Sequence, residues 1–231
     1  MKWTYFLINL LVIAGPLVLS FDKKVAFFKR IKTILWSLTI PSLFYLIWDI
    51  GFTKLHIWEF NYDYLIGISF FRLPLEEYFF FLAIPYACLF IYACLRHYLP
   101  KFKNNATAKT LSILLGFSCL FIVYLNFEKL YTSVTFGLLA FTLFNFVLNK
   151  TEYLSHALLA WIVAIIPMFI VNGLLTGLPV LIYNDSQNLG IRIGTIPVED
   201  FFYNLIYMLW MIGFYERRLR KLAKRAELKE S

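Results

Sequence analysis

Two short segments of the chain carry the same arrangement of a proline, two adjacent carboxylic acids and aromatic residues. Residues 74–80 read Pro-Leu-Glu-Glu-Tyr-Phe-Phe, and residues 197–203 read Pro-Val-Glu-Asp-Phe-Phe-Tyr. A carboxyl group in an apolar pocket can stay protonated near neutral pH, and aromatic faces stabilise cations within about 6 Å. A protonated acid beside aromatic rings would suit proton-initiated carbocation chemistry on an alkene.

Helical spacing places one acid of each motif beside two aromatic rings, because residues three and four positions apart share a helix face. The two sets are Glu76 with Phe79 and Phe80, and Glu199 with Phe202 and Tyr203. The neighbouring acids, Glu77 and Asp200, lie about 100° round the helix. We therefore expect one acid of each pair to orient or tune the other.

A structural role for the acids is the competing interpretation. Proline fits the first turn of a helix, where its missing N–H costs nothing, and acids in that turn meet the helix macrodipole favourably. Glu76 and Glu199 would then only cap two helices at a membrane interface. The same dipole favours the ionised acid, which opposes proton donation. The repetition of the whole pattern favours the chemical role.

The composition is that of a membrane protein. Hydrophobic residues make up 61% of the 231 residues and charged residues only 16%, against about 25% charged in soluble domains. The apolar residues fall in blocks of about 20, the length that crosses a bilayer. We predict an all-α polytopic membrane protein with seven transmembrane helices, at about residues 3–20, 33–51, 76–95, 109–127, 131–149, 154–173 and 199–215.

The positive charges predict the orientation of these helices. With seven spans, 17 of the 22 Lys and Arg residues fall on one side, among them Lys103, Lys150 and the bases of residues 217–231. Basic loops stay in the cytoplasm, so we place the N-terminus outside and the C-terminus inside. We expect the basic tail to lie on anionic membrane lipids, and this distribution argues against a nucleic-acid partner.

A shift of 123 residues aligns the second half of the chain with the first. Over residues 47–82 ten of 36 positions are identical, including the proline and the first glutamate of the motif. The shift maps the first three apolar blocks onto the last three and leaves the fourth as a connector. Three-helix units separated by one helix are parallel, so both motifs face the outer side. The predicted divisions are residues 1–98, 99–128 (the connector loop and helix), 129–216 and 217–231.

The same shift pairs two polar residues inside apolar blocks, Asp49 and Asn172. A polar residue inside a membrane span is a functional candidate, and we include both as substrate-binding candidates. A hydrogen bond between helices is an equally good account of each.

Several motifs of other protein classes do not occur in the sequence. It has no G-x-G-x-x-G, which argues against a flavin or nicotinamide cofactor, and no Asp-Asp-x-x-Asp run for magnesium diphosphate. The last apolar block has no lysine for a retinal Schiff base. The three cysteines lie in apolar blocks and the three histidines lack ligand spacing, so we predict neither a metal nor a cofactor.

The two motifs resemble those of the membrane lycopene cyclases of the heterodimer type. In that family two small homologous three-span subunits, or their fused form, each carry Pro-x-Glu-(Glu/Asp)-x-x-(Phe/Tyr). Residues 73–80 resemble the first subunit, and residues 190–201 closely resemble the second. The resemblance covers essentially the whole chain, as a fused two-unit protein.

This resemblance implies a lycopene β-cyclase of carotenoid biosynthesis, in the cell (inner) membrane of a bacterium. It would cyclise the linear ends of lycopene to β-ionone rings without net redox change. Glu76 and Glu199 would be the acid and base, with Glu77 and Asp200 as partners. The aromatic rings of Phe79, Phe80, Phe202 and Tyr203 would stabilise the cation.

Two other classes of function fit parts of the sequence. Parallel three-helix units and outer-face acids also suit a membrane carrier or channel for a proton-coupled or apolar solute. Against this, we expect the third and seventh spans to run without a proline or glycine break near mid-membrane, although Pro167 interrupts the sixth. A non-catalytic scaffold for other pigment enzymes would leave the paired acids without a purpose.

Overall fold

The computed structural model describes residues 2–102 and 104–230, with side chains described as far as residue 228. Lys103 and the side chain of Lys229, two of the bases that the sequence analysis assigns to the cytoplasmic side, lie outside this description. The same holds for residues 1 and 231, the outer limits of the first and last predicted divisions.

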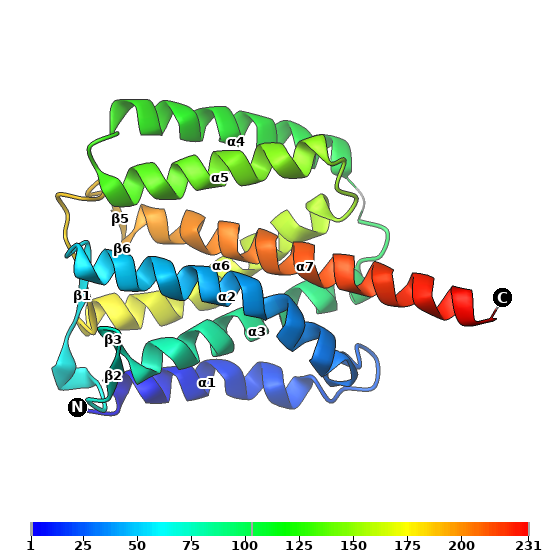
Figure 1. The fold of residues 1–231 in the computed structure, drawn as a ribbon, viewed down its shortest axis with the longest axis horizontal. Coiled ribbons are helices and arrows are strands. Elements are labelled where there is room, and N and C mark those ends of the chain that lie inside the picture. The colour runs from blue at the N-terminus through cyan, green and yellow to red at the C-terminus, as the bar shows by residue number, and fades with distance from the viewer. Residues whose placement is uncertain (1, 103, 231) are drawn as a thin grey trace.

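Helices dominate the described part of the chain and run side by side along one axis (Figure 1). The helices are α1 (Thr4–Leu19), α2 (Ile31–Lys54), α3 (Leu75–Tyr98), α4 (Asn105–Leu125), α5 (Leu130–Leu148), α6 (Leu154–Gly177) and α7 (Val198–Glu230), with 3-10 turns η1 (Phe27–Arg30) and η2 (Tyr62–Tyr64). The prediction of an all-helical protein is confirmed.

Five stretches of this bundle are long and apolar enough to cross a membrane. They are Phe27–Lys54, Leu75–Tyr98, Asn105–Leu125, Leu130–Leu148 and Leu154–Gly177. Helix α1 is apolar but only 16 residues long, and α7 is not among the five. The structure therefore supports a polytopic membrane protein and five of the seven predicted spans on these criteria.

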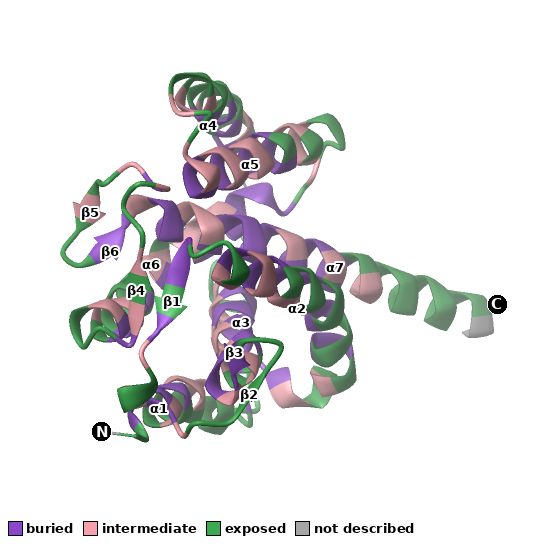
Figure 2. Ribbon diagram, turned by 60° about the vertical axis from the view of Figure 1, so that its left-hand side comes forward, coloured by how far each residue is buried: buried purple, intermediate pink, exposed green. Residues whose placement is uncertain are grey.

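The first half of helix α7 lies inside the bundle. It packs against α2, α3, α5 and α6. Its fully buried hydrophobic residues are Leu205, Ile206, Met208, Leu209, Met211 and Ile212. Since its first half faces protein rather than lipid, polar side chains in it do not meet the hydrocarbon. Beyond residue 216 the same helix leaves the bundle as an exposed arm (Figure 2).

Prolines interrupt three of the long helices. The expectation that the third span runs without such a break is wrong, because Pro85 lies inside α3. Pro41 and Pro167 lie inside α2 and α6 in the same way. Each removes one backbone hydrogen bond from its helix.

Six short strands form the connections at one end of the bundle. They are β1 (Trp58–Phe60), β2 (Ser69–Phe70), β3 (Leu73–Pro74), β4 (Leu181–Tyr183), β5 (Arg192–Ile193) and β6 (Ile196–Pro197). Strand β1 pairs with β4 in antiparallel register, Trp58 opposite Tyr183, and so joins two loops that are far apart in sequence. Strands β2 and β3 form one hairpin, and β5 and β6 form another.

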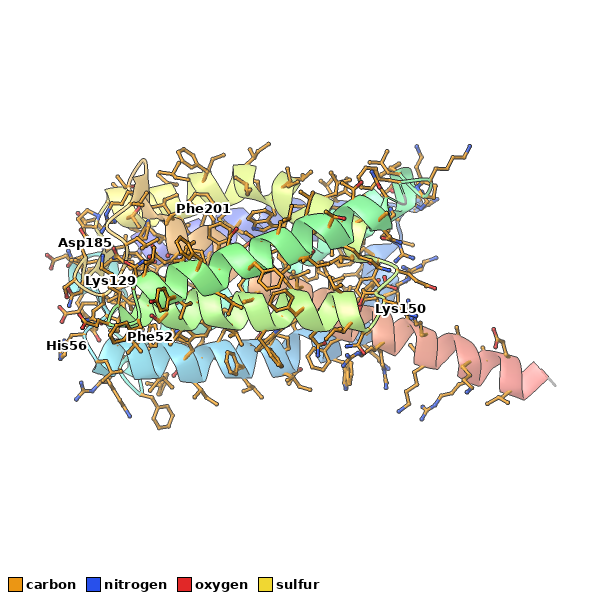
Figure 3. All side chains as sticks on the ribbon, turned by 90° about the horizontal axis from the view of Figure 1, so that it is seen from above. Phe52, His56, Lys129, Lys150, Asp185 and Phe201 are labelled. Carbon is orange, nitrogen blue, oxygen red and sulfur yellow. The ribbon has the colours of Figure 1, made fainter. Side chains whose placement is uncertain are left out.

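The element boundaries recur with the shift found in the sequence. Helix α2 begins at Ile31 and α6 begins 123 residues later at Leu154. The same separation relates β1 to β4, each hairpin to the other, and the first residue of α3 to that of α7. Both acidic motifs directly follow a hairpin and so lie at the strand-bearing end. Phe201 of the second motif lies toward the same end as His56 and Asp185, and Lys150 lies at the opposite end (Figure 3).

Candidate functional site

A short hairpin leads directly into each helix that carries an acidic pair. Strand β3 ends at Pro74 and α3 begins at the next residue, so Glu76 and Glu77 lie in the first helical turn. The first backbone N–H of each helix donates to the carbonyl of the residue just before its own hairpin, Leu75 to Ile68 at 2.9 Å and Val198 to Ile191 at 3.0 Å. This fixes the direction in which both acidic pairs enter the bundle.

The first acid of each pair binds the loop that precedes its helix. Glu76 and Glu199 are both 0% exposed. Glu76 accepts from the N–H of Ile66 at 2.7 Å, and Glu199 accepts from the N–H of Leu189 at 2.7 Å. The Thr132 hydroxyl donates to the same Glu199 oxygen at 2.7 Å. The second oxygen of each carboxyl has no hydrogen-bond partner among the described residues.

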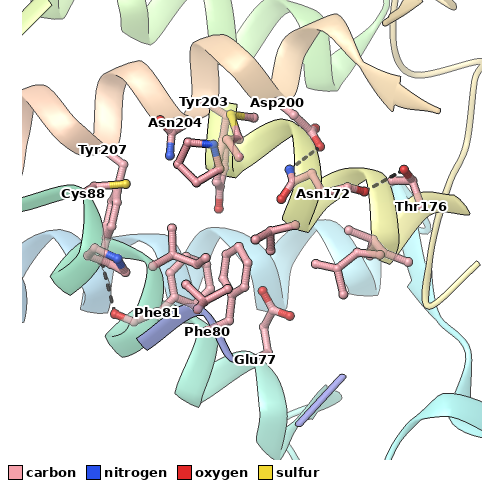
Figure 4. Close-up of a pocket in the computed structure, with 18 of the residues that line it drawn as sticks. Glu77, Phe80, Phe81, Cys88, Asn172, Thr176, Asp200, Tyr203, Asn204 and Tyr207 are labelled. Carbon is pink, nitrogen blue, oxygen red and sulfur yellow. Dashed lines mark hydrogen bonds between the residues drawn. The ribbon is translucent and has the colours of Figure 1, made fainter. Parts of the chain in front are cut away.

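An apolar cavity lies beside both motifs (Figure 4). Its volume is about 100 Å³, and it lies between residues of α1, α2, α3, α5, α6, α7, β1 and β4. The second acid of each pair, Glu77 or Asp200, lines this cavity, together with Asp49 and Asn172, whereas the first acids do not. The fold thus brings one carboxyl from each motif to the same space.

Three hydrogen-bond donors surround Asp200. Tyr131 donates its phenol to Oδ1 at 2.6 Å, and Tyr183 donates to Oδ2 at 2.8 Å. The Asn172 amide donates to the same Oδ2 at 3.1 Å, as drawn in Figure 4. A carboxylate accepts at both oxygens, so this set of partners suits the ionised form of Asp200.

The surroundings of Glu77 differ from those of Asp200. Tyr5 donates its phenol to Glu77 Oε2 at 2.5 Å. A second acid is also present, since the Asp49 carboxyl interacts with Glu77 and lines the same cavity. Asp49 and Glu77 are 3% and 6% exposed. The first motif therefore contributes a pair of buried carboxyl groups to the cavity.

Two of the four predicted aromatic walls line the cavity. Phe80 and Tyr203 do so, whereas Phe79 and Phe202 do not. The Phe79 side chain is 42% exposed and packs against Phe6 of α1 with the ring centroids 5.8 Å apart.

On each helix, the residues that line the cavity share a helix face with the second acid of the pair and not with the first. Positions three, four and seven after that acid line the cavity on both helices. The residues are Glu77, Phe80, Phe81 and Ile84 on α3, and Asp200, Tyr203, Asn204 and Tyr207 on α7. The helical spacing rule held, but it starts one residue later than the sequence analysis assumed.

A model of the lycopene cyclase family matches residues 2–95 and 128–217, which contain both motifs and every residue that lines the cavity. The chain belongs to the lycopene cyclase family. No curated protein and no solved structure matches it. Family membership, together with the long apolar helices, indicates a carotenoid cyclase that acts in a membrane on a carotenoid substrate.

The lycopene cyclase match falls in two segments that leave out α4 and most of the exposed arm of α7. The resemblance noted in the sequence is thereby confirmed at the level of the family. The unmatched α4 packs mainly against α5 and lies at the edge of the bundle in Figure 1. It contributes no residue to the cavity lining.

Sequence reasoning missed the tyrosines that hold the cyclase's two cavity acids. Tyr5 and Tyr131 lie at corresponding places in α1 and α5, but 126 residues apart instead of 123. The two matched segments also begin 126 residues apart, at 2 and 128. Three extra residues between α1 and α2 explain the difference, and an alignment that allowed this gap would have paired the two tyrosines.

Tyr183 reaches the cavity from β4, outside the long helices. Burial, and after it the neighbouring Asp200, raise the pKa of the Tyr183 phenol well above its ordinary value. The phenol therefore stays protonated and remains a donor to Asp200. The antiparallel pair that joins β1 to β4 holds Tyr183 opposite Trp58, which also lines the cavity.

Proposed function

We propose that the protein is a lycopene β-cyclase, which converts linear carotenoid ends to β-ionone rings. The observation that carries this proposal is the meeting of Glu77 and Asp200 in one apolar, aromatic-lined cavity. An acid and a base on opposite sides of such a space are what a proton-initiated cyclisation of an alkene requires.

The reaction needs no redox partner. An acid adds a proton to the terminal C=C of the linear end and leaves a tertiary cation. The neighbouring double bond attacks this cation, forms the ring C–C bond and moves the positive charge to a ring carbon. A base removes a proton from the adjacent carbon to leave the ring alkene. One proton enters and one leaves, so the product is an isomer of the substrate.

The walls of the cavity suit the cationic stage. Phe80 and Tyr203 line it on α3 and α7, and aromatic faces attract cations electrostatically. Tyr45 and Trp48 hold the Tyr203 ring in place, with centroids at 4.5 and 5.1 Å. A largely apolar lining also keeps water from the cation, which would otherwise be captured as an alcohol.

We assign the proton transfers to Glu77 and Asp200, and a loop-holding role to Glu76 and Glu199. This exchanges the roles that the sequence suggested within each pair. It is supported by the cavity lining, which includes only the second acids, and by the backbone N–H groups that occupy the first acids. Asn172 acts by orienting Asp200.

We further propose one active site shared by both halves. The lining extends along α3 from Glu77 to Ile91. At 1.5 Å per residue this is a depth of about 21 Å. A linear polyene would enter with one end at the acids and its remaining chain along the cavity, so each binding event would close one ring.

The membrane arrangement that supports this site has seven spans, in two parallel three-helix units joined by α4. The two three-helix units would be residues 1–98 and 129–216, with 99–128 as the connector and 217–231 as a cytoplasmic tail. The acidic motifs and the basic Lys150 lie at opposite ends of the bundle, as the positive-inside rule requires of an N-terminus outside (Figure 3). We place it in the bacterial cell membrane.

The direct test is expression in a bacterium that accumulates lycopene. We expect red lycopene to become orange-yellow cyclic carotene, identified by chromatography and mass. Glu128→Gln is a suitable control, since Glu128 is exposed and is not among the residues that line the cavity. Unchanged lycopene in cells that hold the protein correctly inserted in the membrane would contradict the proposal and favour a carrier.

A further inference from the structure

The two halves of the cavity contribute equivalent positions but different chemical groups. The 123-residue shift places Asp49 on Asn172 and Glu77 on Asp200. All four residues line the cavity. The first half therefore offers two carboxyl groups, and the second offers one carboxyl and one amide. This difference separates the two halves chemically although their backbones correspond.

The carboxyl pair of the first half has no compensating cation. Within the described residues, none of the ion pairs involves Asp49 or Glu77. Two buried carboxylates beside the same cavity repel each other, and burying an unpaired charge is costly. The pair is stable when one proton lies between the two groups. Tyr5 adds a hydrogen bond to Glu77 but supplies no positive charge.

The second half is arranged for a bare carboxylate. The Asn172 amide has no proton to release and donates to Asp200, as do the phenols of Tyr131 and Tyr183. Hydrogen bonds donated to both oxygens stabilise the charged carboxylate. A proton on Asp200 would displace one of these donors.

We propose that the Asp49–Glu77 pair is the proton donor of the cyclisation and that Asp200 is the proton acceptor. This rests on the proposed cyclase function and assigns its two proton transfers. The shared proton leaves the pair for the terminal alkene carbon, and both acids are then carboxylates facing the cation. Asp200 takes the proton that leaves the ring, which restores a neutral product. The position of Asp200 fixes which carbon loses its proton and hence which ring isomer forms.

Loss of the proton donor and loss of the proton acceptor should leave different products, which product analysis can distinguish. Without the donor no cation forms, so Asp49→Asn should leave lycopene unreacted, with ring formation reduced about 100-fold or more. Without the acceptor the cation still forms. Asp200→Asn should therefore give rings with the double bond shifted, or ring alcohols in which water adds to the cation and releases a proton to the solvent.

Two further variants guard against misfolding and test the asymmetry. Asp49→Glu keeps a carboxyl and should convert at least about ten times more lycopene than Asp49→Asn. Asn172→Asp gives the second half the same carboxyl pair as the first. It should impair proton removal and produce the shifted products expected of Asp200→Asn.

The experiment uses full-length protein purified in detergent, checked for monodispersity, with lycopene in mixed micelles. If wild type makes no ring, the proposed function itself fails. If wild type makes rings, four results overturn only the assignment of donor and acceptor. These are normal conversion by Asp49→Asn, shifted rings from Asp49→Asn, and normal β-rings or unreacted lycopene alone from Asp200→Asn.

Discussion

At the scale of single residues, adjacent acids in each motif have different surroundings. A rotation of about 100° along the helix separates a carboxyl that faces the loop from one that faces the cavity. Glu76 meets the N–H of Ile66, and Glu77 meets Tyr5 and Asp49. Under the proposed function, neighbours in sequence have a structural task and a chemical task.

Neutralising each acid of the first pair should have different effects. Glu77→Gln removes a carboxyl from the cavity, so we expect conversion of lycopene to fall about 100-fold with little change in thermal stability. Glu76→Gln leaves a buried amide beside the loop. We expect a loss of about 1–3 kcal/mol of stability and much of the activity retained.

Thermal unfolding and initial rates, measured on both purified variants, check this pair of expectations. The opposite pattern, with Glu76→Gln inactive but stable and Glu77→Gln active, would return the catalytic role to the first acid. It would also favour the original sequence-based assignment of Glu76.

The motif, its repetition and the helical spacing of its residues could be read directly from the sequence. The choice between neighbouring acids could not be predicted, because it depends on how α1 and α5 pack against the starts of α3 and α7. Spacing within one helix says which residues share a face but not which face meets a cavity. The contacts of Tyr5 and Tyr131 with the second acids supply that information.

At the scale of elements, the hairpins fix the direction in which the acidic helices α3 and α7 enter the bundle. Gly190 precedes β5 with a φ of +73°, next to Leu189, whose N–H binds Glu199. A residue with a Cβ is strained in that conformation, by roughly 1–2 kcal/mol.

We therefore expect Gly190→Ala to destabilise the protein by about 1 kcal/mol or more, and to lower activity by displacing the Leu189 N–H. Gly173→Ala is the matched control. Gly173 lies inside helix α6 with open space around its Cβ position, where alanine is favoured by up to about 1 kcal/mol. Thermal unfolding of the two variants decides, and equal melting temperatures would contradict a strained turn at Gly190.

The loop between β4 and β5 carries an acid that responds to pH outside the membrane. The hydrogen bond from Asn188, with Arg192 adding to it, lowers the pKa of Asp185. A lowered pKa stabilises the folded state above the ordinary value of about 4, and this is lost as the pH falls through the folded value. Asp185 is 57% exposed, so the contribution is below about 1 kcal/mol.

Asp185→Asn should accordingly lower the melting temperature slightly and by the same amount from pH 5 to pH 8. The difference between wild type and variant should disappear below about pH 3. Melting curves across this pH range test the direction in which the stabilisation by Asp185 changes with pH. A difference that disappears between pH 8 and pH 6 would mean that another group governs the loop.

At the scale of the whole molecule, the two halves enclose one cavity. Strands β1 and β4 join their loops, and α7 of the second half packs against α2 and α3 of the first. The seven apolar blocks of the sequence each coincide with a helix, which periodicity and length could predict. The sequence left open whether the two motifs share one cavity, since this depends on pairing between loops 123 residues apart.

A single cavity predicts one ring per binding event. In a time course with purified wild-type protein and limiting lycopene, the monocyclic product should appear first. Any bicyclic product should follow only as the monocyclic carotene is rebound. Bicyclic product from the earliest time points, with no monocyclic carotene at any time, would indicate two sites acting together.

The central claim is that a carboxyl from each half acts on the same carotenoid end. Its most direct test is the conversion of lycopene by purified wild-type protein, Glu77→Gln, Asp200→Asn and the control Glu128→Gln, followed by chromatography. We predict β-rings from wild type and control, and loss of normal β-rings from either cavity-acid variant alone. Normal β-ring formation by Glu77→Gln or Asp200→Asn would contradict a site shared between the two halves.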